Sequence, residues 1–485
     1  RLIEDDAMSD RSLSLLSLRR LMQDWRDSAT APAYRQIANR LRFAILDGRV
    51  GLGVKLPGER RLADELEVAR ITVSQAYDLL RAEGFLESGQ GRGSVTVLPD
   101  GAEALQEGAS ADPGLMDLAA ATTRAHPDLA PAYRKAMAHL PALLPHSGYE
   151  MRGEIGLRRV LADRYAEDGV ALAPDQILIS QGAQHGLVLL IRAFLKPGDP
   201  VAVDLPSYPN ALEAFHRAGV QMRGYPVTDN GWSVAELERD LAQGRYKMAY
   251  LIADHHNPTG QVMDADARFR LARAAKRGGA LLVFDECVRE LWRDAPPPVI
   301  DPPHYRAPVV RLGSASKVFW GGLRTGWIAA DRRIIDQVHA ARSSIDLGGP
   351  PLEQITTRIL YEDFPDAVDR QRAQLRDEHA FLSGEIARRF PDWTSLKVEG
   401  GLSLWLRLPR PVSPELSAAA REWGLKLEPG PRFFLQQGGA HNLRLPFSRD
   451  RDFMVRALDL LEPAWRQVCA TPGLAKEVRV EAPVF

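Results

Sequence analysis

The chain has 485 residues, of which 45% are hydrophobic and 26% are charged, and its formal net charge at pH 7 is −1. This composition predicts a globular protein of more than one domain and excludes a disordered or uniformly basic chain. No apolar run approaches 18 residues and no charged-then-apolar leader is present, so we expect a cytoplasmic protein without a membrane segment. Cys287 and Cys469 form no CxxC pair, which argues against a disulfide framework or a thiolate zinc site.

Helical periodicity begins after a predicted N-terminal extension, residues 1–30. A first helix is predicted before Asp47-Gly48 because apolar side chains recur there at helical spacing: Tyr34, Ile37, Leu41, Ala44 and Ile45. A second helix is predicted over 59–66, and a short turn leads to a third, whose apolar face carries Val73, Ala76, Tyr77 and Leu80. Two helices joined by so short a turn form a helix-turn-helix, whose second helix can enter the major groove of DNA.

A β-hairpin is predicted to complete this domain, residues 31–98. Residues 85–87 and 94–97 alternate about a glycine-rich turn, which is typical of the wing of a winged helix. The expected solvent side carries side chains that suit phosphate contacts and base reading: Arg60, Arg61, Arg70, Thr72, Ser74, Gln75 and Arg92. Basic residues barely outnumber acidic ones, so on charge alone the pattern favours a small helical domain with a solvated face.

The combined stretch LPGERRLADELEVARITVSQAYDLLRAEGFLESGQGRGSVTV closely resembles the winged helix of the GntR family of bacterial regulators. This resemblance implies that Arg60, Arg70, Thr72 and Arg92 contact DNA, and we expect Arg61, on the same predicted solvent side, to contact it as well. Two positions depart from the family pattern, because Gly58 and Ala69 stand where serine is usual. Glycine is tolerated as a helix cap, and alanine removes one possible phosphate donor.

A second, larger domain is predicted over residues 115–470, after a flexible linker at 99–114 and before a tail at 471–485. Apolar strands are predicted at 176–180, 201–204, 248–253, 280–285 and 309–312, and amphipathic runs such as 265–277 separate them. This alternation predicts an α/β fold with a mostly parallel sheet covered by helices. In such sheets, ligands bind beyond the carboxyl ends of the strands.

The stretch from 308 to 330, PVVRLGSASKVFWGGLRTGWIAA, organises the predicted chemistry. Lys317 follows a short strand, lies between small hydroxyl residues that include Ser314, and precedes Arg324 by seven positions. A lysine that forms an imine with an aldehyde cofactor needs this placement, since hydroxyl and guanidinium groups nearby can hold a phosphate. The alternative is a solvated loop lysine beside an ordinary glycine turn.

Four other strand ends carry matching side chains. Gly182 and Ala183 precede an apolar helix whose first amides can hold an anion, and Tyr208 offers a ring that can stack on a flat cofactor. Asn257 can donate to a phenolic oxygen, while Asp285 ends an apolar strand and needs a cationic partner such as a protonated pyridine nitrogen. The adjacent histidines at 255 and 256 point opposite ways on an extended segment, so no metal site is predicted.

With these motifs, residues 115–470 resemble a fold-type I aminotransferase domain, the class that depends on pyridoxal 5′-phosphate. The resemblance implies an internal aldimine on Lys317, a pyridinium contact from Asp285, a ring-hydroxyl contact from Asn257 and stacking by Tyr208. It assigns the phosphate to Gly182, Ala183, Ser314 and Arg324. Tyr149 resembles the tyrosine that reaches the phosphate of the neighbouring subunit, and Arg444 resembles the arginine that binds a substrate carboxylate.

A GntR-type winged helix joined to such a domain is the architecture of the MocR family. The resemblance implies a homodimeric regulator, expected to be domain-swapped, that binds promoter DNA and senses an amino acid, an amine or the cofactor itself. One departure is Val288, three residues after Asp285, where aminotransferases commonly carry a tyrosine that tunes the imine. The loss favours sensing over full turnover. The alternatives are a working aminotransferase with an accessory domain, and a regulator that binds no cofactor.

Overall fold

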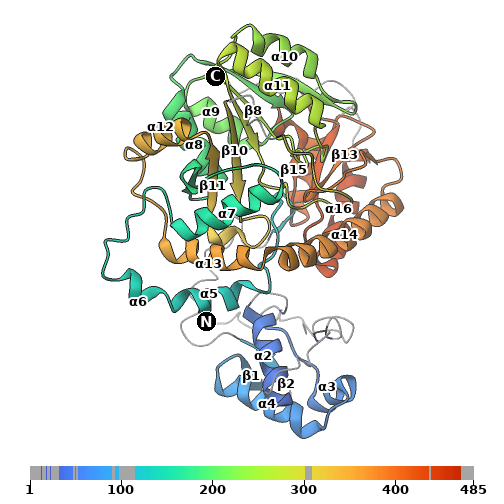
Figure 1. Cartoon of the computed structure of the whole chain (residues 1–485). Coiled ribbons are helices and arrows are strands. Elements are labelled where there is room, and N and C mark those ends of the chain that lie inside the picture. The colour runs from blue at the N-terminus through green and yellow to red at the C-terminus, as the bar shows by residue number, and fades with distance from the viewer. Residues whose placement is uncertain are drawn as a thin grey trace, which may run out of the picture. The chain divides into compact units, whose positions relative to one another are not determined.

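The computed structural model describes residues 13, 18, 22, 32–46, 50, 53–89, 93–97, 115–300, 308–435 and 438–470. The chain divides into two compact units, residues 1–113 and residues 114–485, each of which is described by itself (Figure 1). The predicted linker at 99–114, the predicted tail at 471–485 and Arg92 lie outside the described residues. Within the described part, no helix is both long enough and apolar enough to cross a bilayer.

Among its described residues, the first unit has three continuous helices and a two-stranded hairpin. Its helices are α2 (Ala33–Leu46), α3 (Glu59–Leu66) and α4 (Arg70–Ala82), and its antiparallel strands are β1 (Leu86–Gly89) and β2 (Gly93–Thr96). The apolar faces of the helices meet in one core, which also contains Leu18 and Met22 from the predicted N-terminal extension. The winged helix-turn-helix predicted from periodicity is therefore confirmed.

The turn between α3 and α4 departs from the usual capping chemistry. Gly58 and Ala69 precede the two helices, and neither supplies a side-chain hydrogen bond to the helix start. Glu67 closes α3 in the left-handed conformation at φ 53°, and its backbone N–H donates to the Ala63 carbonyl. Tyr77 of α4 is buried, and its hydroxyl donates to the Pro57 carbonyl at 2.8 Å. The two helices are therefore stabilised by tertiary packing in place of side-chain caps.

The second unit is built on an eight-stranded sheet in the order β4-β11-β10-β9-β8-β5-β6-β7. The predicted strands appear as β4 (Ile177–Ser180), β5 (Pro200–Leu205), β8 (Met248–Leu251), β9 (Leu281–Asp285) and β10 (Val309–Ser314). The sheet also contains β6 (Gln221–Thr228), β7 (Gly231–Trp232) and β11 (Gly326–Ala330). The pairs from β10 through β9, β8 and β5 to β6 are parallel, whereas β11 pairs antiparallel with β4 and β10. The mostly parallel α/β sheet is thus confirmed.

Helices cover both faces of this sheet (Figure 1). One face packs on α8 (Ala183–Phe194), α9 (Pro209–Arg217) and α12 (Arg332–Arg342), through alternate strand residues such as Leu178, Val203 and Ile328. The other face packs on α7 (Ile155–Glu167), α10 (Val234–Ala242), α11 (Ala265–Gly278) and α13 (Pro351–Glu362). Because both faces are buried, the strands β4, β8 and β9 are buried at every position and largely apolar, as expected for a parallel sheet, whereas β6 alternates with exposed residues towards the sheet edge.

A smaller lobe follows in sequence, around a sheet in the order β12-β13-β16-β15. Its strands are β12 (Thr394–Ser395), β13 (Ser403–Arg407), β15 (Glu428–Pro429) and β16 (Asn442–Pro446), and its helices are α14 (Phe364–Arg389), α15 (Ser413–Glu422) and α16 (Arg451–Ala470). A parallel pair of β3 (Met116–Asp117) with β14 (Leu425–Lys426) joins the start of the unit to this lobe. The described residues also form α5 (Leu129–Met137) and α6 (Leu140–Leu143), with short 3-10 turns at Pro174–Gln176, Gly321–Leu323 and Gly430–Phe433.

Candidate functional sites

A cavity of about 510 Å³ lies at the carboxyl ends of the parallel strands. The backbone or side chains of nine residues singled out from the sequence line it: Gly182, Ala183, Tyr208, Asn257, Asp285, Ser314, Lys317, Arg324 and Arg444. These residues come from segments up to 262 positions apart, the separation of Gly182 from Arg444. The topology brings them together because the ends of parallel strands meet at one edge of the sheet.

Lys317 lies in the turn after β10. Its Nζ donates to the Ala121 carbonyl at 2.8 Å, and its own carbonyl accepts a hydrogen bond from Thr123 Oγ1 at 2.9 Å. Burial lowers the pKa of the Lys317 amine, because the charged form loses its hydration. A lowered pKa makes the neutral, nucleophilic amine more available than on an exposed lysine. The segment before α5 was not assigned a role from the sequence, yet it supports this lysine.

Asp285 ends β9 and is only 9% exposed. Its Oδ2 accepts from the Tyr250 hydroxyl at 2.5 Å, and its Oδ1 accepts from the Cys287 backbone N–H at 3.0 Å. Burial raises the pKa of Tyr250, so the phenol keeps its proton and remains a donor. Tyr250 carries no functional signal in the sequence, because a tyrosine on an apolar strand has the pattern of a core residue. Val288 lines the cavity, so no hydroxyl is present at that position.

A ring of donors surrounds the start of α8. Gly182 caps the helix at φ 85°, and a Cβ at this position would lie 2.8 Å from Arg324 Nη2. Arg324 Nη2 donates to the Gln181 carbonyl at 3.0 Å, so the guanidinium is held close to the helix start. Ser314 Oγ accepts from the Ser316 N–H at 3.2 Å, while Ser316 Oγ is buried without a hydrogen-bond partner in the described part of the chain. Backbone amides, hydroxyls and a guanidinium form a donor set that suits an anion.

Arg444 and Asn257 meet on another wall of the cavity. Arg444 Nη1 donates to Asn257 Oδ1 at 3.2 Å, and Nη2 donates to the Ala119 carbonyl. The guanidinium carbon lies 5.0 Å from the centre of the Phe433 ring. Arg444 is 6% exposed, and burial lowers its pKa. The site therefore holds a poorly hydrated cation beside the predicted ring-hydroxyl contact.

Two tyrosines singled out from the sequence occupy different environments. Tyr208 precedes α9 and lines the cavity, where its oxygen accepts from Asn210 Nδ2 at 2.9 Å and burial raises its pKa. Tyr149 is 66% exposed and lies outside the cavity of its own chain. Its predicted contact with a neighbouring subunit stays a prediction.

The adjacent histidines are both buried and both line the cavity. His256 Nδ1 lies 2.9 Å from Thr259 Oγ1, and burial lowers the pKa of His256 to about 3 and that of His255 to about 4. Both rings are therefore neutral near pH 7. Among the described residues, no group of three or more His, Cys, Asp or Glu side chains has the arrangement of a metal site.

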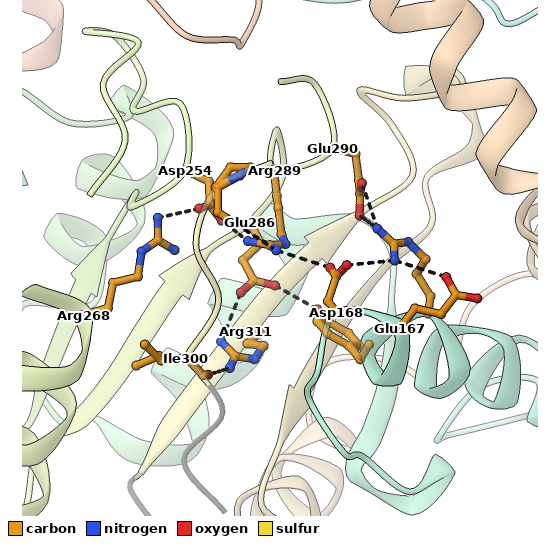
Figure 2. A network of polar contacts seen from close by, with 12 residues as sticks. Glu167, Asp168, Asp254, Arg268, Glu286, Arg289, Glu290, Ile300 and Arg311 are labelled. Carbon is orange, nitrogen blue, oxygen red and sulfur yellow. Dashed lines mark hydrogen bonds and ion pairs between the residues drawn. The ribbon is translucent and has the colours of Figure 1, made fainter. Parts of the chain in front are cut away.

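A network of buried charges holds the segment that follows Asp285 (Figure 2). Glu286 Oε2 accepts from the Tyr165 hydroxyl at 3.0 Å, and Glu286 Oε1 accepts from Arg311 Nη1 at 3.2 Å. Because Glu286 directly follows the last residue of β9, anchoring its side chain also restrains the backbone next to Asp285. The Glu286 pKa is raised mainly by burial, and the nearby Arg311 opposes that rise.

Arg289 extends the network to a second strand end (Figure 2). Its Nη2 donates to Asp168 Oδ2 at 3.3 Å, and its Nη1 lies 3.6 Å from Asp254 Oδ2. Asp254 is also 2.7 Å from Arg268 Nη2 and precedes the turn that carries Asn257. This network could not be predicted from the sequence, because its charged residues are far apart along the chain and form no local pattern.

The predicted DNA-contacting residues lie on α3 and at the start of α4. Arg60 and Arg61 are exposed, and Thr72 is half-buried. The Arg70 side chain is 72% exposed, and its Nε and Nη2 each lie 3.3 Å from Glu59 Oε2. The structure therefore presents three cations on the two helices of the helix-turn-helix. Arg92 falls outside the described residues.

Comparison with known proteins accounts for both units. The family described as aminotransferase class I and II matches residues 126–452, and the gntR family of bacterial regulatory proteins matches residues 33–95. The chain belongs to the aminotransferase class I and II family. Its GntR domain precedes that domain, so the predicted MocR-type architecture is confirmed.

Similar proteins include both enzymes and regulators. The 2-aminoadipate transaminase of Thermus thermophilus is 30% identical over 333 residues, which cover 66% of this chain and 84% of that enzyme. The probable rhizopine catabolism regulatory protein MocR of Rhizobium meliloti is 27% identical over 445 residues, or 84% of this chain and 90% of that protein. The crystal structure of LysN from Thermus thermophilus, an alpha-aminoadipate aminotransferase complexed with N-(5′-phosphopyridoxyl)-L-leucine, has a TM-score of 0.67 and 26% identity, and the match covers 74% of this chain and 94% of LysN.

The chain is thus a GntR-type regulator fused to an aminotransferase domain, whose cofactor is pyridoxal 5′-phosphate. The residues of the cavity fit this group. Gly182 leaves room where a Cβ would meet Arg324, the buried Ser316 hydroxyl lacks a hydrogen-bond partner among the described residues, and Asp285 faces the same space as Lys317. An anion-binding donor set, a carboxylate and a buried amine are the groups that the phosphate, ring nitrogen and aldehyde of this cofactor require.

Proposed function

We propose that this protein is a DNA-binding transcriptional regulator that senses an amino acid, an amine or the cofactor itself through pyridoxal phosphate bound at Lys317. One observation carries the proposal: a buried amine with a lowered pKa shares a cavity with Asp285, in a chain that also contains a GntR-type domain. The bound cofactor supplies an aldehyde and an electron-withdrawing ring.

Each residue of the cavity has a role in this proposal. The Lys317 amine, whose pKa burial lowers, is the group that would attach the cofactor, and Asp285, held by Tyr250, would keep a proton on its ring nitrogen. The donors around Gly182, Ala183, Ser314 and Arg324 bind the phosphate, while Asn257 and Tyr208 orient the ring. Arg444 binds the carboxylate of an effector, because a desolvated guanidinium forms strong bidentate hydrogen bonds.

The signal must reach the DNA-binding domain as a difference in free energy. An effector changes DNA affinity only if it binds two arrangements of the protein with different affinities. We further propose a homodimer, in which the exposed Tyr149 of each subunit reaches the cofactor phosphate of the other. Under this arrangement, each cavity is complete only in the dimer, and effector binding acts on both subunits.

Transamination is the second candidate, and the cavity supports it because Lys317, Asp285 and Arg444 line the same space. Val288 favours sensing, since the hydroxyl that aminotransferases use to tune the imine is missing at this position. Repeated turnover of an amino donor with a keto acid would support the enzyme, whereas capture that stops after one equivalent would support the sensor.

A gel-shift series with full-length protein tests the regulatory proposal. The DNA upstream of its own gene is titrated without cofactor, with pyridoxal phosphate, and with cofactor plus individual amino acids and amines. We expect at least one compound to change DNA affinity by about 5- to 150-fold, the range typical of allosteric coupling of about 1–3 kcal/mol. An affinity that no addition changes, in protein that shows the absorbance of bound cofactor, would contradict sensing.

A further inference from the structure

The start of α4 exposes an apolar side chain. Ile71, the second residue of the helix, is 64% exposed, whereas Val73, Ala76, Tyr77 and Leu80 of the same helix are buried. Single exposed apolar side chains are common on protein surfaces. The neighbours of Ile71 set it apart from such cases, because they belong to the surface predicted to contact DNA.

Exposed arginines and an exposed amide lie on the same helix as Ile71 or on its neighbour α3. Arg70 precedes it in the sequence, and the exposed Arg60 and Arg61 lie on the neighbouring helix α3. Gln75 is exposed four residues after Ile71, so the two side chains share one face of the helix a single turn apart. The surface therefore combines cations that attract phosphates with one apolar and one amide side chain that do not.

We propose that Ile71 reads the 5-methyl group of a thymine in the major groove of the operator, and that Gln75 presents its amide to the adjoining base pair. Thymine is the base that displays an apolar group in this groove, and an amide pairs well with the N6 and N7 edge of adenine. The arginines position the protein on the backbone, while Ile71 and Gln75 contribute base preference. This inference rests on the proposed DNA binding.

The test removes only the methyl group from the DNA. A randomised duplex library is enriched on the full-length protein, and each thymine of the enriched sequence is then replaced in turn by deoxyuridine. Gel shifts give the dissociation constants for the wild type, Ile71→Val, Ile71→Ala and Gln75→Ala. Because alanine favours helix and Ile71 is exposed, Ile71→Ala should remain folded.

We expect one or two thymines at which deoxyuridine weakens wild-type binding about fourfold, which corresponds to about 0.8 kcal/mol for one buried methyl group. At those thymines the penalty should disappear in Ile71→Ala, persist in part in Ile71→Val, and remain complete in Gln75→Ala. Equal penalties in the wild type and Ile71→Ala would overturn the inference even if the protein binds DNA tightly. Failure to enrich any sequence would instead contradict DNA binding itself, and the inference with it.

Discussion

The two units place their functional side chains in opposite environments. In the winged helix, Arg70 presents a side chain that is 72% exposed, whereas in the aminotransferase domain Asp285 is 9% exposed and Arg444 is 6% exposed. An exposed cation keeps its hydration and acts on phosphates through long-range attraction. A buried charge has lost that hydration, so it needs fixed partners such as the Tyr250 hydroxyl on Asp285.

This difference affects how each unit tolerates change. Substitution of an exposed side chain removes one contact and leaves the fold nearly unaffected. Substitution within the cavity also changes the partners of the lost group, because buried polar atoms left unpaired cost about 1–3 kcal/mol each. The following predictions test this contrast between the exposed and the buried site.

Lys317→Ala should have the largest effect, because it removes the amine that attaches the cofactor. We expect no visible absorbance from covalently bound pyridoxal phosphate, while the circular dichroism spectrum and the DNA affinity without cofactor stay close to those of the wild type. Lys247→Ala is the matched control, since Lys247 is exposed and precedes β8 at the opposite ends of the strands. Loss of DNA binding in a folded Lys317→Ala protein would show that the two sites are not separate.

Glu378→Gln tests the cost of a buried charge in the large unit. Burial raises the Glu378 pKa from its usual 4.5 to about 7, although Gln374 and Arg124 donate to its Oε1. The folded state therefore stays protonated while the unfolded state ionises, so the wild type loses stability as the pH rises from about 4.5 to about 7. The variant should gain relative stability over that window, by at most about 3 kcal/mol.

Urea unfolding at pH 3, 4, 5, 6, 7 and 8 measures this difference. A difference in unfolding free energy between Glu378→Gln and the wild type that does not change with pH would contradict the raised pKa of Glu378. Glu385→Gln provides a control of opposite sign, because hydrogen bonds from Arg388 and Arg389 lower the Glu385 pKa. The free energy of unfolding of the wild type should therefore exceed that of Glu385→Gln above about pH 4.5. This difference in stability should decrease as the pH falls through the lowered pKa of Glu385.

Arg70→Ala should affect only the exposed site. Loss of one direct DNA contact costs about 1–3 kcal/mol, so operator affinity should fall about 5- to 150-fold while cofactor absorbance is unchanged. Gel shifts at several salt concentrations show which contact is lost. Loss of a phosphate contact reduces the slope of log affinity against log salt concentration by about one, whereas loss of a base contact relaxes specificity at one position. An unchanged affinity would remove Arg70 from the predicted contact set.

Glu59→Gln should have the smallest effect and the opposite direction. Glu59 Oε2 lies 3.3 Å from Arg70 Nε, and DNA must compete with this pair for the guanidinium. Exposed ion pairs contribute about 0.2–1 kcal/mol, so removal of the carboxylate should tighten operator binding by at most about fivefold. The same gel shift measures the change, and weaker binding of Glu59→Gln would indicate that Glu59 orients Arg70 for DNA.

Much of the site could be predicted from the sequence because its residues stand at strand ends. Asp285 ends an apolar strand, and Asn257 and Lys317 follow such strands; the ends of parallel strands meet at one edge whatever the side-chain details. The helix-turn-helix could also be predicted from the sequence, since the apolar faces of α3 and α4 follow from helical periodicity. Local patterns of this kind determined the elements, the sheet type and the chemical groups available.

The three-dimensional fold alone decided which partners those groups acquire. The Lys317 amine donates to the carbonyl of Ala121, a residue 196 positions earlier, and Arg444 donates to the carbonyl of Ala119. Backbone carbonyls carry no signature in the sequence, and Tyr250 has the pattern of an ordinary core residue. Burial then lowers the pKa of Lys317 and raises that of Tyr250, because the loss of hydration depends on everything packed around a group. The identities of the reacting groups are local properties of the chain, whereas their charge and orientation depend on neighbours that only folding brings together.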